Sequence, residues 1–175
     1  GAIQVDKTKQ IEAFYRDLIW SDPKKVKDAL KFQQGPRVPQ TCEWIMDVQE
    51  VKDWLNPKSE NNVLWVSGDH GRGKSTMAVY LAERLTRNFA PDAAKTCAYF
   101  FCDSKDSQRN TAQGILRGLL LQIFQNHPHL LSDRIRRRHA HRGARVFEKP
   151  QALWNLLVEV ASRSDRHLFC IIDGL

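Results

Sequence analysis

The chain has 175 residues, the length of one domain, and its 42% hydrophobic and 27% charged residues are typical of a globular protein with a real core. The net charge of +7 is a local feature, because six arginines lie within residues 134–145 and the chain without them would carry +1, so we expect no nucleic acid partner. No stretch approaches the roughly 18 apolar residues of a membrane span, and the four cysteines are too sparse for a disulfide framework, so we expect a cytoplasmic protein without membrane contact.

Helices dominate the expected structure of the first 57 residues. Apolar residues at helical spacing predict an amphipathic helix over residues 7–20, and the cap-and-proline sequence Ser21-Asp22-Pro23 begins a second helix. One glycine and two prolines make residues 33–40 a break. Short helices are predicted around 41–45 and over 48–55. We expect residues 1–57 to form an N-terminal helical segment and linker, followed by a second unit over residues 58–175.

Strand and helix patterns alternate in this second unit. The apolar run VLWVS at 63–67 predicts a buried parallel strand, and the patterns at 95–102 and 167–175 predict two more. Amphipathic helices are predicted over 74–89 and 111–125, and from Pro150 onward. This alternation favours an α/β fold with a largely parallel sheet in three layers.

The glycine-rich stretch GDHGRGKS at residues 68–75 matches G-x-x-x-x-G-K-[ST] in full and stands between a predicted strand and a predicted helix. Glycines adopt positive φ and expose consecutive N–H groups, and the following helix adds its own free N–H groups, so the stretch predicts an anion site. Lys74 is expected to reach the β- and γ-phosphates of a nucleotide, Ser75 to ligate Mg²⁺, and Thr76 to meet the α-phosphate. The residues expected to hold the phosphates are Gly68, Asp69, Gly71, Arg72, Gly73, Lys74, Ser75 and Thr76.

An acid at the end of a hydrophobic strand is the usual counterpart of such a loop. The run LFCIID at 168–173 has this form, so we expect Asp173 to hold Mg²⁺ together with Ser75. Taken alone, an aspartate at a strand end more often caps a turn, and the assignment depends on the glycine loop upstream. No guanine-reading N-K-x-D motif is present, so both ATP and GTP remain open as the nucleotide.

Five segments together resemble the NACHT domains of fungal STAND proteins, the signal-transduction NTPases related to NLR immune receptors and to heterokaryon-incompatibility proteins. These segments are TCEWI, VKDWL, VLWVSGDHGRGKST, AYFFCDSKDSQRNTAQGILRGLLLQI and LFCIIDGL. The resemblance implies that residues 58–175 are the N-terminal part of a P-loop NTPase core. It also implies a switch that rests with ADP or GDP, exchanges it for ATP or GTP with Mg²⁺, and then forms a homo-oligomer alongside the other domains of its parent protein. The segment 41–45 would approach the purine.

The sequence departs from the family at its C-terminal end. In the family, further acidic residues follow the Walker-B strand and activate water, and a later strand with a γ-phosphate sensor lies between the Walker-A and Walker-B strands. The chain stops at Leu175, so we expect a slot in the sheet. Either the chain is a fragment of a larger parent protein, or a partner fills the slot, or the strands have closed up so that no slot remains. We expect the parent to be an NTPase and this chain alone to bind nucleotide with little hydrolysis, and beyond Lys74 we assign no catalytic residue.

Two other functions remain open from the sequence. A small-molecule or nucleotide kinase would suit the length, and its Walker-A and Walker-B strands would be direct neighbours, so no slot would arise. The arginines of 134–145 suggest a nucleic-acid-stimulated ATPase, although the segment lacks interleaved aromatic residues that could stack on bases. A solvated helix end and loop is the simpler interpretation of these arginines, with an acidic protein surface as an alternative partner. Either Arg109 or Arg117 could contact phosphate or a neighbouring subunit.

Overall fold

The computed structural model describes residues 2–90 and 94–175, and within them it is a mixed α/β fold. The α-helices are α1 (Ala2–Leu18), α2 (Pro23–Gln34), α3 (Gln49–Leu55), α4 (Lys74–Phe89), α5 (Ala112–Asn126), α6 (Asp133–Arg142) and α7 (Pro150–Arg163). Three short 3₁₀ helices are η1 (Glu43–Asp47), η2 (Pro128–Leu130) and η3 (Gly143–Phe147). The strands are β1 (Lys95–Phe101) and β2 (His167–Asp173).

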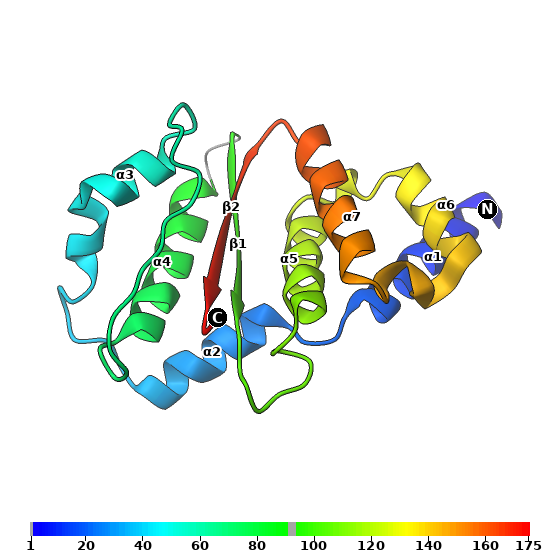
Figure 1. The fold of residues 1–175 in the computed structure, drawn as a ribbon. Helices are drawn as coiled ribbons and strands as arrows, with labels where there is room; N and C mark the ends of the chain where they lie inside the picture. The colour runs from blue at the N-terminus through cyan, green and yellow to red at the C-terminus, as the bar shows by residue number, and fades with distance from the viewer. Residues whose placement is uncertain (1, 91–93) are drawn as a thin grey trace.

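The two strands are parallel and run in register from the pair Lys95–His167 to the pair Phe101–Asp173. Figure 1 shows them between two helical layers, with α2, α3 and α4 on one side and α5 and α7 on the other. Successive side chains of a strand point to opposite faces, so each face of the sheet has its own core. Ala98 and Phe100 pack with α1, α5 and α7, whereas Tyr99 and Phe101 pack with α4 and α3. The predicted three-layer arrangement with parallel strands is confirmed.

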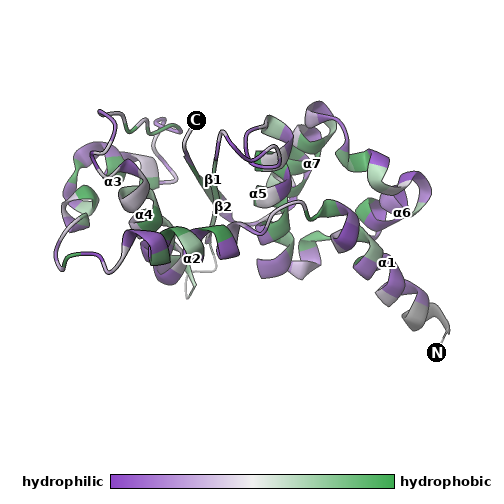
Figure 2. Ribbon diagram, turned by 90° about the horizontal axis from the view of Figure 1, so that it is seen from below, coloured by the Kyte–Doolittle hydropathy of each residue, from purple (hydrophilic) through white to green (hydrophobic). Residues whose placement is uncertain are grey.

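The N-terminal helix is part of the core on the α5 side. Phe14 and Leu18 of α1 are completely buried against the hydrophobic residues of α5, α6 and α7. Hydrophobic residues (green in Figure 2) are frequent on α5 and α7, and hydrophilic residues cover much of α1. Helix α2 begins as predicted, because the side chain of Asp22 accepts hydrogen bonds from the N–H groups of Lys24 and Lys25. The boundary at residue 57 stays a prediction.

The strand predicted at 63–67 is wrong. These residues form no regular secondary structure, and Val63 and Trp65 are 81% and 73% exposed. A strand requires a neighbour for its N–H and C=O groups, and within the described residues β1 and β2 pair only with each other. The apolar run therefore lies unpaired, and the sheet has two strands where three were expected.

No helix in the described part of the chain is long and apolar enough to cross a membrane.

Candidate functional site

The glycine-rich loop ends where α4 begins, and the space beside its backbone is not filled by other described parts of the chain. Gly71 and Gly73 have φ of +77° and +81°, the left-handed region that favours glycine, and no atom lies within 4 Å of the position that a Cβ would occupy at either residue. Gly73 is the N-cap residue of α4 and supplies no side-chain cap. The first N–H groups of α4 therefore stay available to an anion, in the position where the helix dipole is positive.

Lys74 is folded back onto the loop. Its Nζ donates hydrogen bonds to the backbone carbonyl oxygens of Gly68, at 2.6 Å, and Asp69, at 2.8 Å. The ammonium group thus lies inside the concave side of the loop, held by neutral acceptors. A phosphate oxygen is a stronger partner for this cation than a carbonyl, because a charge-assisted pair is roughly twice as strong as a neutral one.

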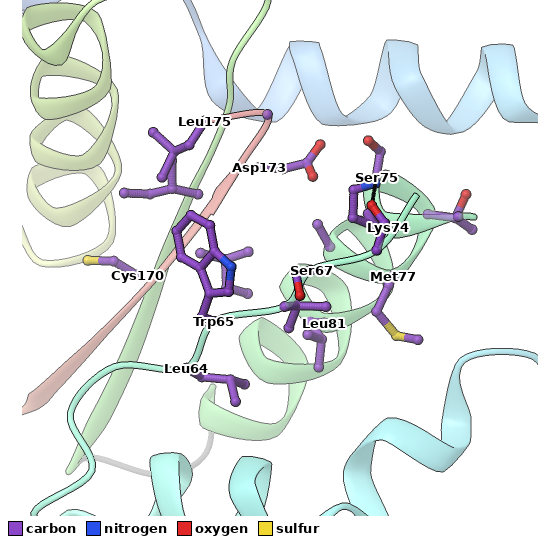
Figure 3. Close-up of a pocket in the computed structure, with 18 of the residues that line it drawn as sticks. Leu64, Trp65, Ser67, Lys74, Ser75, Met77, Leu81, Cys170, Asp173 and Leu175 are labelled. Carbon is purple, nitrogen blue, oxygen red and sulfur yellow. Dashed lines mark hydrogen bonds between the residues drawn. The ribbon is translucent and has the colours of Figure 1, made fainter. Parts of the chain in front are cut away.

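A cavity of about 960 Å³ adjoins the loop. The glycine loop and the start of α4 form one part of its lining, the unpaired residues 62–67 form a second, and residues 170–175 at the end of β2 form a third. Figure 3 shows the 62–67 segment passing between α4 and β2. The cavity lies between residues 62–67 and the end of β2, the place where the expected sheet order predicted a slot. A volume in this range suits a drug-sized or nucleotide-sized ligand.

The side chain of Asp173 extends from the end of β2 toward Ser75 and Lys74 (Figure 3). The backbone holds its position, because the Asp173 carbonyl accepts a hydrogen bond from the Cys102 N–H at 2.8 Å and Gly174 follows with a positive φ of 81°. Within the described residues the Asp173 carboxylate has no hydrogen bond or ion pair of its own. The tertiary structure therefore brings the two residues predicted to hold Mg²⁺ to one cavity.

The donor set fits Mg²⁺ with a nucleotide. Mg²⁺ prefers oxygen ligands and is usually held by one or two protein groups, with water and substrate phosphates in its remaining positions. The Ser75 hydroxyl and the Asp173 carboxylate supply two such oxygens. No group of three or more His, Cys, Asp or Glu side chains in the described chain could hold a metal without a further ligand.

The sequence of the chain matches a known protein family and a known relative. Residues 40–175 match the family model described as "Nephrocystin 3, N-terminal". The chain belongs to this family. It is also 28% identical over 164 residues to the Vegetative incompatibility protein HET-E-1 of Podospora anserina, an alignment that covers 91% of the chain and 12% of that protein. These two matches support the NACHT-like region expected from the sequence. No solved structure matched the chain significantly.

Other residues considered for the site lie elsewhere in this member of the nephrocystin 3 N-terminal family. Residues 41–45 do not line the cavity, and Trp44 is 59% exposed on η1. Arg109 is held by Asp103 and Asp106 in its own loop, at 2.6 and 2.9 Å. Arg117 is buried and donates to the backbone carbonyls of Leu18, at 3.0 Å, and Asp17. Neither arginine is free to contact a phosphate in this conformation.

Several cavity residues were not expected from the sequence. Trp54 of α3 and Gln34 at the end of α2 line it, as does Cys170 of β2. Burial raises the pKa of the Cys170 thiol to about 11, so this thiol is neutral at physiological pH. The spacing of Trp54 and Gln34 along the chain does not predict that both line this cavity, because their positions depend on how α2 and α3 pack against α4.

Proposed function

We propose that this chain binds a nucleoside triphosphate, ATP or GTP, together with Mg²⁺, and that it is the nucleotide-dependent switch module of a STAND-type signalling protein. The observation that carries the proposal is the single cavity lined by the glycine loop, the uncapped start of α4, Ser75 and Asp173. The free N–H groups bind phosphate oxygens, and Lys74 exchanges its two loop carbonyls for the β- and γ-phosphates. Mg²⁺ supplies charge neutralisation between the phosphates and is held by Ser75 and Asp173.

The signalling role rests on the family match and on the relative from Podospora anserina, a vegetative incompatibility protein. The chain spans 12% of the length of that relative, so the effector and sensor domains, the exchange of diphosphate for triphosphate and the oligomer belong to the proposal for a longer protein. We expect hydrolysis by this chain to be slow, because Asp173 is the only aspartate or glutamate among the described residues that line the cavity.

The two alternative functions have less support. A kinase of the predicted kind would pair the segment before the glycine loop directly with β2, whereas a cavity separates the two. A nucleic-acid-stimulated ATPase would bring its basic residues toward the nucleotide. The arginines of α6 lie at the end of the molecule away from α4 (Figure 1).

Equilibrium binding of ATP and GTP, with and without Mg²⁺, tests the proposal. Lys74→Ala is expected to weaken binding at least about tenfold, because a hydrogen bond to a charged group contributes roughly 1.5–3 kcal/mol. Asp173→Asn is expected to remove the gain in affinity that Mg²⁺ gives and to leave the Mg²⁺-free affinity nearly unchanged. Lys9→Ala, an exposed lysine of α1, is the matched control. Unaltered nucleotide affinity in Lys74→Ala, or no binding by a folded wild-type sample, would overturn the proposal.

A further inference from the structure

A groove of about 230 Å³ lies between α1 and α6, at the end of the molecule away from α4 (Figure 1). Its lining is entirely polar and consists of Asp6, Lys7, Gln10, Asp133, Arg136 and Arg137. The two helices are fixed to each other, because Ile135 and Phe14 are buried in one core and His139 Nε2 lies 2.9 Å from Oδ2 of Asp17. The walls of the groove are therefore held in place before any ligand binds.

Cations outnumber acids in this lining, and two of the cations are unpaired. Arg136 is buried and paired with Asp133, and Asp6 accepts a hydrogen bond from a neighbouring glutamine at 2.9 Å. Lys7 and Arg137 are exposed, and neither side chain has a hydrogen bond, ion pair or ring contact within the described chain. The groove therefore presents positive charge that this part of the protein does not neutralise.

The positive charge continues from the groove along α6 into η3. Residues 133–149 contain six arginines and one lysine against two acidic residues. Two of these arginines are used inside the molecule, because they contact Glu159 of α7 at 3.2 and 4.0 Å. Arg142 and Arg145 are exposed and have no partner among the residues that the structure describes. We define the basic surface as the four exposed, unpaired cations: Lys7, Arg137, Arg142 and Arg145.

The surroundings of the basic surface restrict the kind of partner that it fits. Among residues 133–149 no large hydrophobic side chain is exposed, so none is suited to anchor in a bilayer. Phe147 is the one phenylalanine, tyrosine or tryptophan in this range, and it is completely buried, so no such ring is available to stack on the bases of a single strand. Arginine pairs well with carboxylates, because its planar guanidinium presents two parallel N–H donors to the two oxygens. Acidic side chains of a polypeptide are therefore the ligand that the surface favours.

We propose that the basic surface binds an acidic, extended segment of a partner protein. Helix α6 has ten residues and is about 15 Å long, a length that an extended peptide of about five residues covers. Carboxylates of the segment pair with the three free arginines, and Lys7 attracts the segment from the α1 side of the groove. A second copy of this chain offers no such segment, because no two of its 20 acidic residues are closer than three positions in the sequence. Exposed ion pairs are individually weak and screened by salt, so the binding is salt-dependent.

Fluorescence anisotropy of a labelled hexapeptide of glutamate, titrated with nuclease-treated chain, tests this inference. Saturable binding is expected at about 50 mM salt, with an affinity at least about tenfold lower at about 500 mM, where the screening length drops to a few ångströms. A hexapeptide of glutamine is the uncharged control and is expected not to bind. Neutralisation of the basic surface (Lys7→Gln, Arg137→Gln, Arg142→Gln, Arg145→Gln) weakens binding of the glutamate peptide at least about tenfold. The matched control neutralises four exposed cations of other segments, Lys25, Lys58, Arg84 and Arg87, and leaves the affinity within about twofold.

The two neutralised variants separate a specific surface from a general effect of charge. No binding of the glutamate peptide by folded wild-type chain at low salt, equal loss of affinity in both variants, or equal binding of the glutamine peptide would overturn the inference. Displacement of the peptide by a lower concentration of negative charge on RNA, DNA or phosphatidylserine vesicles would assign the basic surface to nucleic acid or to a membrane instead. Release of the peptide as the chain self-associates would assign it to a second copy. The four cations do not line the cavity beside the glycine loop, so Lys74→Ala is expected to leave the peptide affinity unchanged, and failure of one proposal leaves the other intact.

Discussion

At the scale of single residues, Arg117 is an unusually buried cation. Its side chain donates to the last carbonyls of α1, those of Asp17 and Leu18, and its guanidinium lies 4.2 Å from the centre of the Trp20 ring. Burial lowers the pKa of Arg117 to about 10, and the nearby Asp17 raises it, so the group stays charged at neutral pH. The residue therefore fastens the end of α1 to α5.

Arg117→Met tests this contact. We expect the free energy of unfolding to fall by about 2–4 kcal/mol, because the methionine fills part of the volume but leaves the buried carbonyl of Leu18 and the half-buried carbonyl of Asp17 without this donor. Urea denaturation gives the measurement, and Arg87→Met on the exposed part of α4 is the control, expected to stay within about 0.5 kcal/mol of wild type. Equal stability of the two variants would mean that the contacts of Arg117 add nothing to the attachment of α1.

At the scale of elements, α5 comes close to the sheet at Gly118. A Cβ built there would lie 2.5 Å from the Phe100 ring of β1 and 3.0 Å from Cγ of Pro23 at the start of α2. A methyl group has no room at this point, and the glycine lets three elements meet. Gly118 lies inside a regular helix, so its backbone has a conformation that any residue can adopt. The missing side chain, and not backbone freedom, is the reason for a glycine here.

Gly118→Ala is expected to lower the free energy of unfolding by about 1–3 kcal/mol, because overpacking of the core outweighs the roughly 1 kcal/mol by which alanine favours a helix. Thermal and urea unfolding both measure the change. The control is Gln125→Ala, an exposed position of the same helix, where alanine is expected to be neutral. A stabilised Gly118→Ala protein would show that α5 can move away from β1 without cost.

At the scale of the whole molecule, the unpaired segment 62–67 leaves apolar side chains in solvent. Trp65 is 73% exposed, whereas Trp54 packs edge-to-face on Phe169 of β2 with ring centroids 5.4 Å apart. Contiguous exposed apolar surface of this kind marks a place where a protein binds a partner or aggregates. The exposure follows from the absence of a neighbouring strand, and not from a polar sequence.

The two tryptophans are expected to respond differently to substitution. Trp65→Gln changes the free energy of unfolding by less than about 0.5 kcal/mol, because little apolar area is lost from the core, and it lowers the fluorescence of a bound hydrophobic dye. Trp54→Ala is expected to cost about 2–4 kcal/mol as the packing against Phe169 is lost. If Trp65→Gln proved as destabilising as Trp54→Ala, segment 62–67 would have to pack against the core in solution.

The sequence by itself determined the local elements and the chemistry of the loop. Periodicity and caps predict α2, α4, α5 and α7, because a helix satisfies its own backbone hydrogen bonds and needs only one apolar face. The motif around Lys74 and the acid at Asp173 likewise follow from residue type and spacing, and the structure places both at one cavity. The helices and the two motifs depend only on residues that are close together in the sequence.

Only the tertiary structure decided which apolar runs become strands and which charges remain free. A strand depends on a partner from elsewhere in the chain, so residues 95–101 and 167–173 pair while the equally apolar 63–67 does not. The same dependence on distant neighbours places Arg138 against Glu159 of α7 and leaves the adjacent Arg137 exposed. Pairing and burial are properties of contacts between remote segments, and no local pattern in the sequence encodes them.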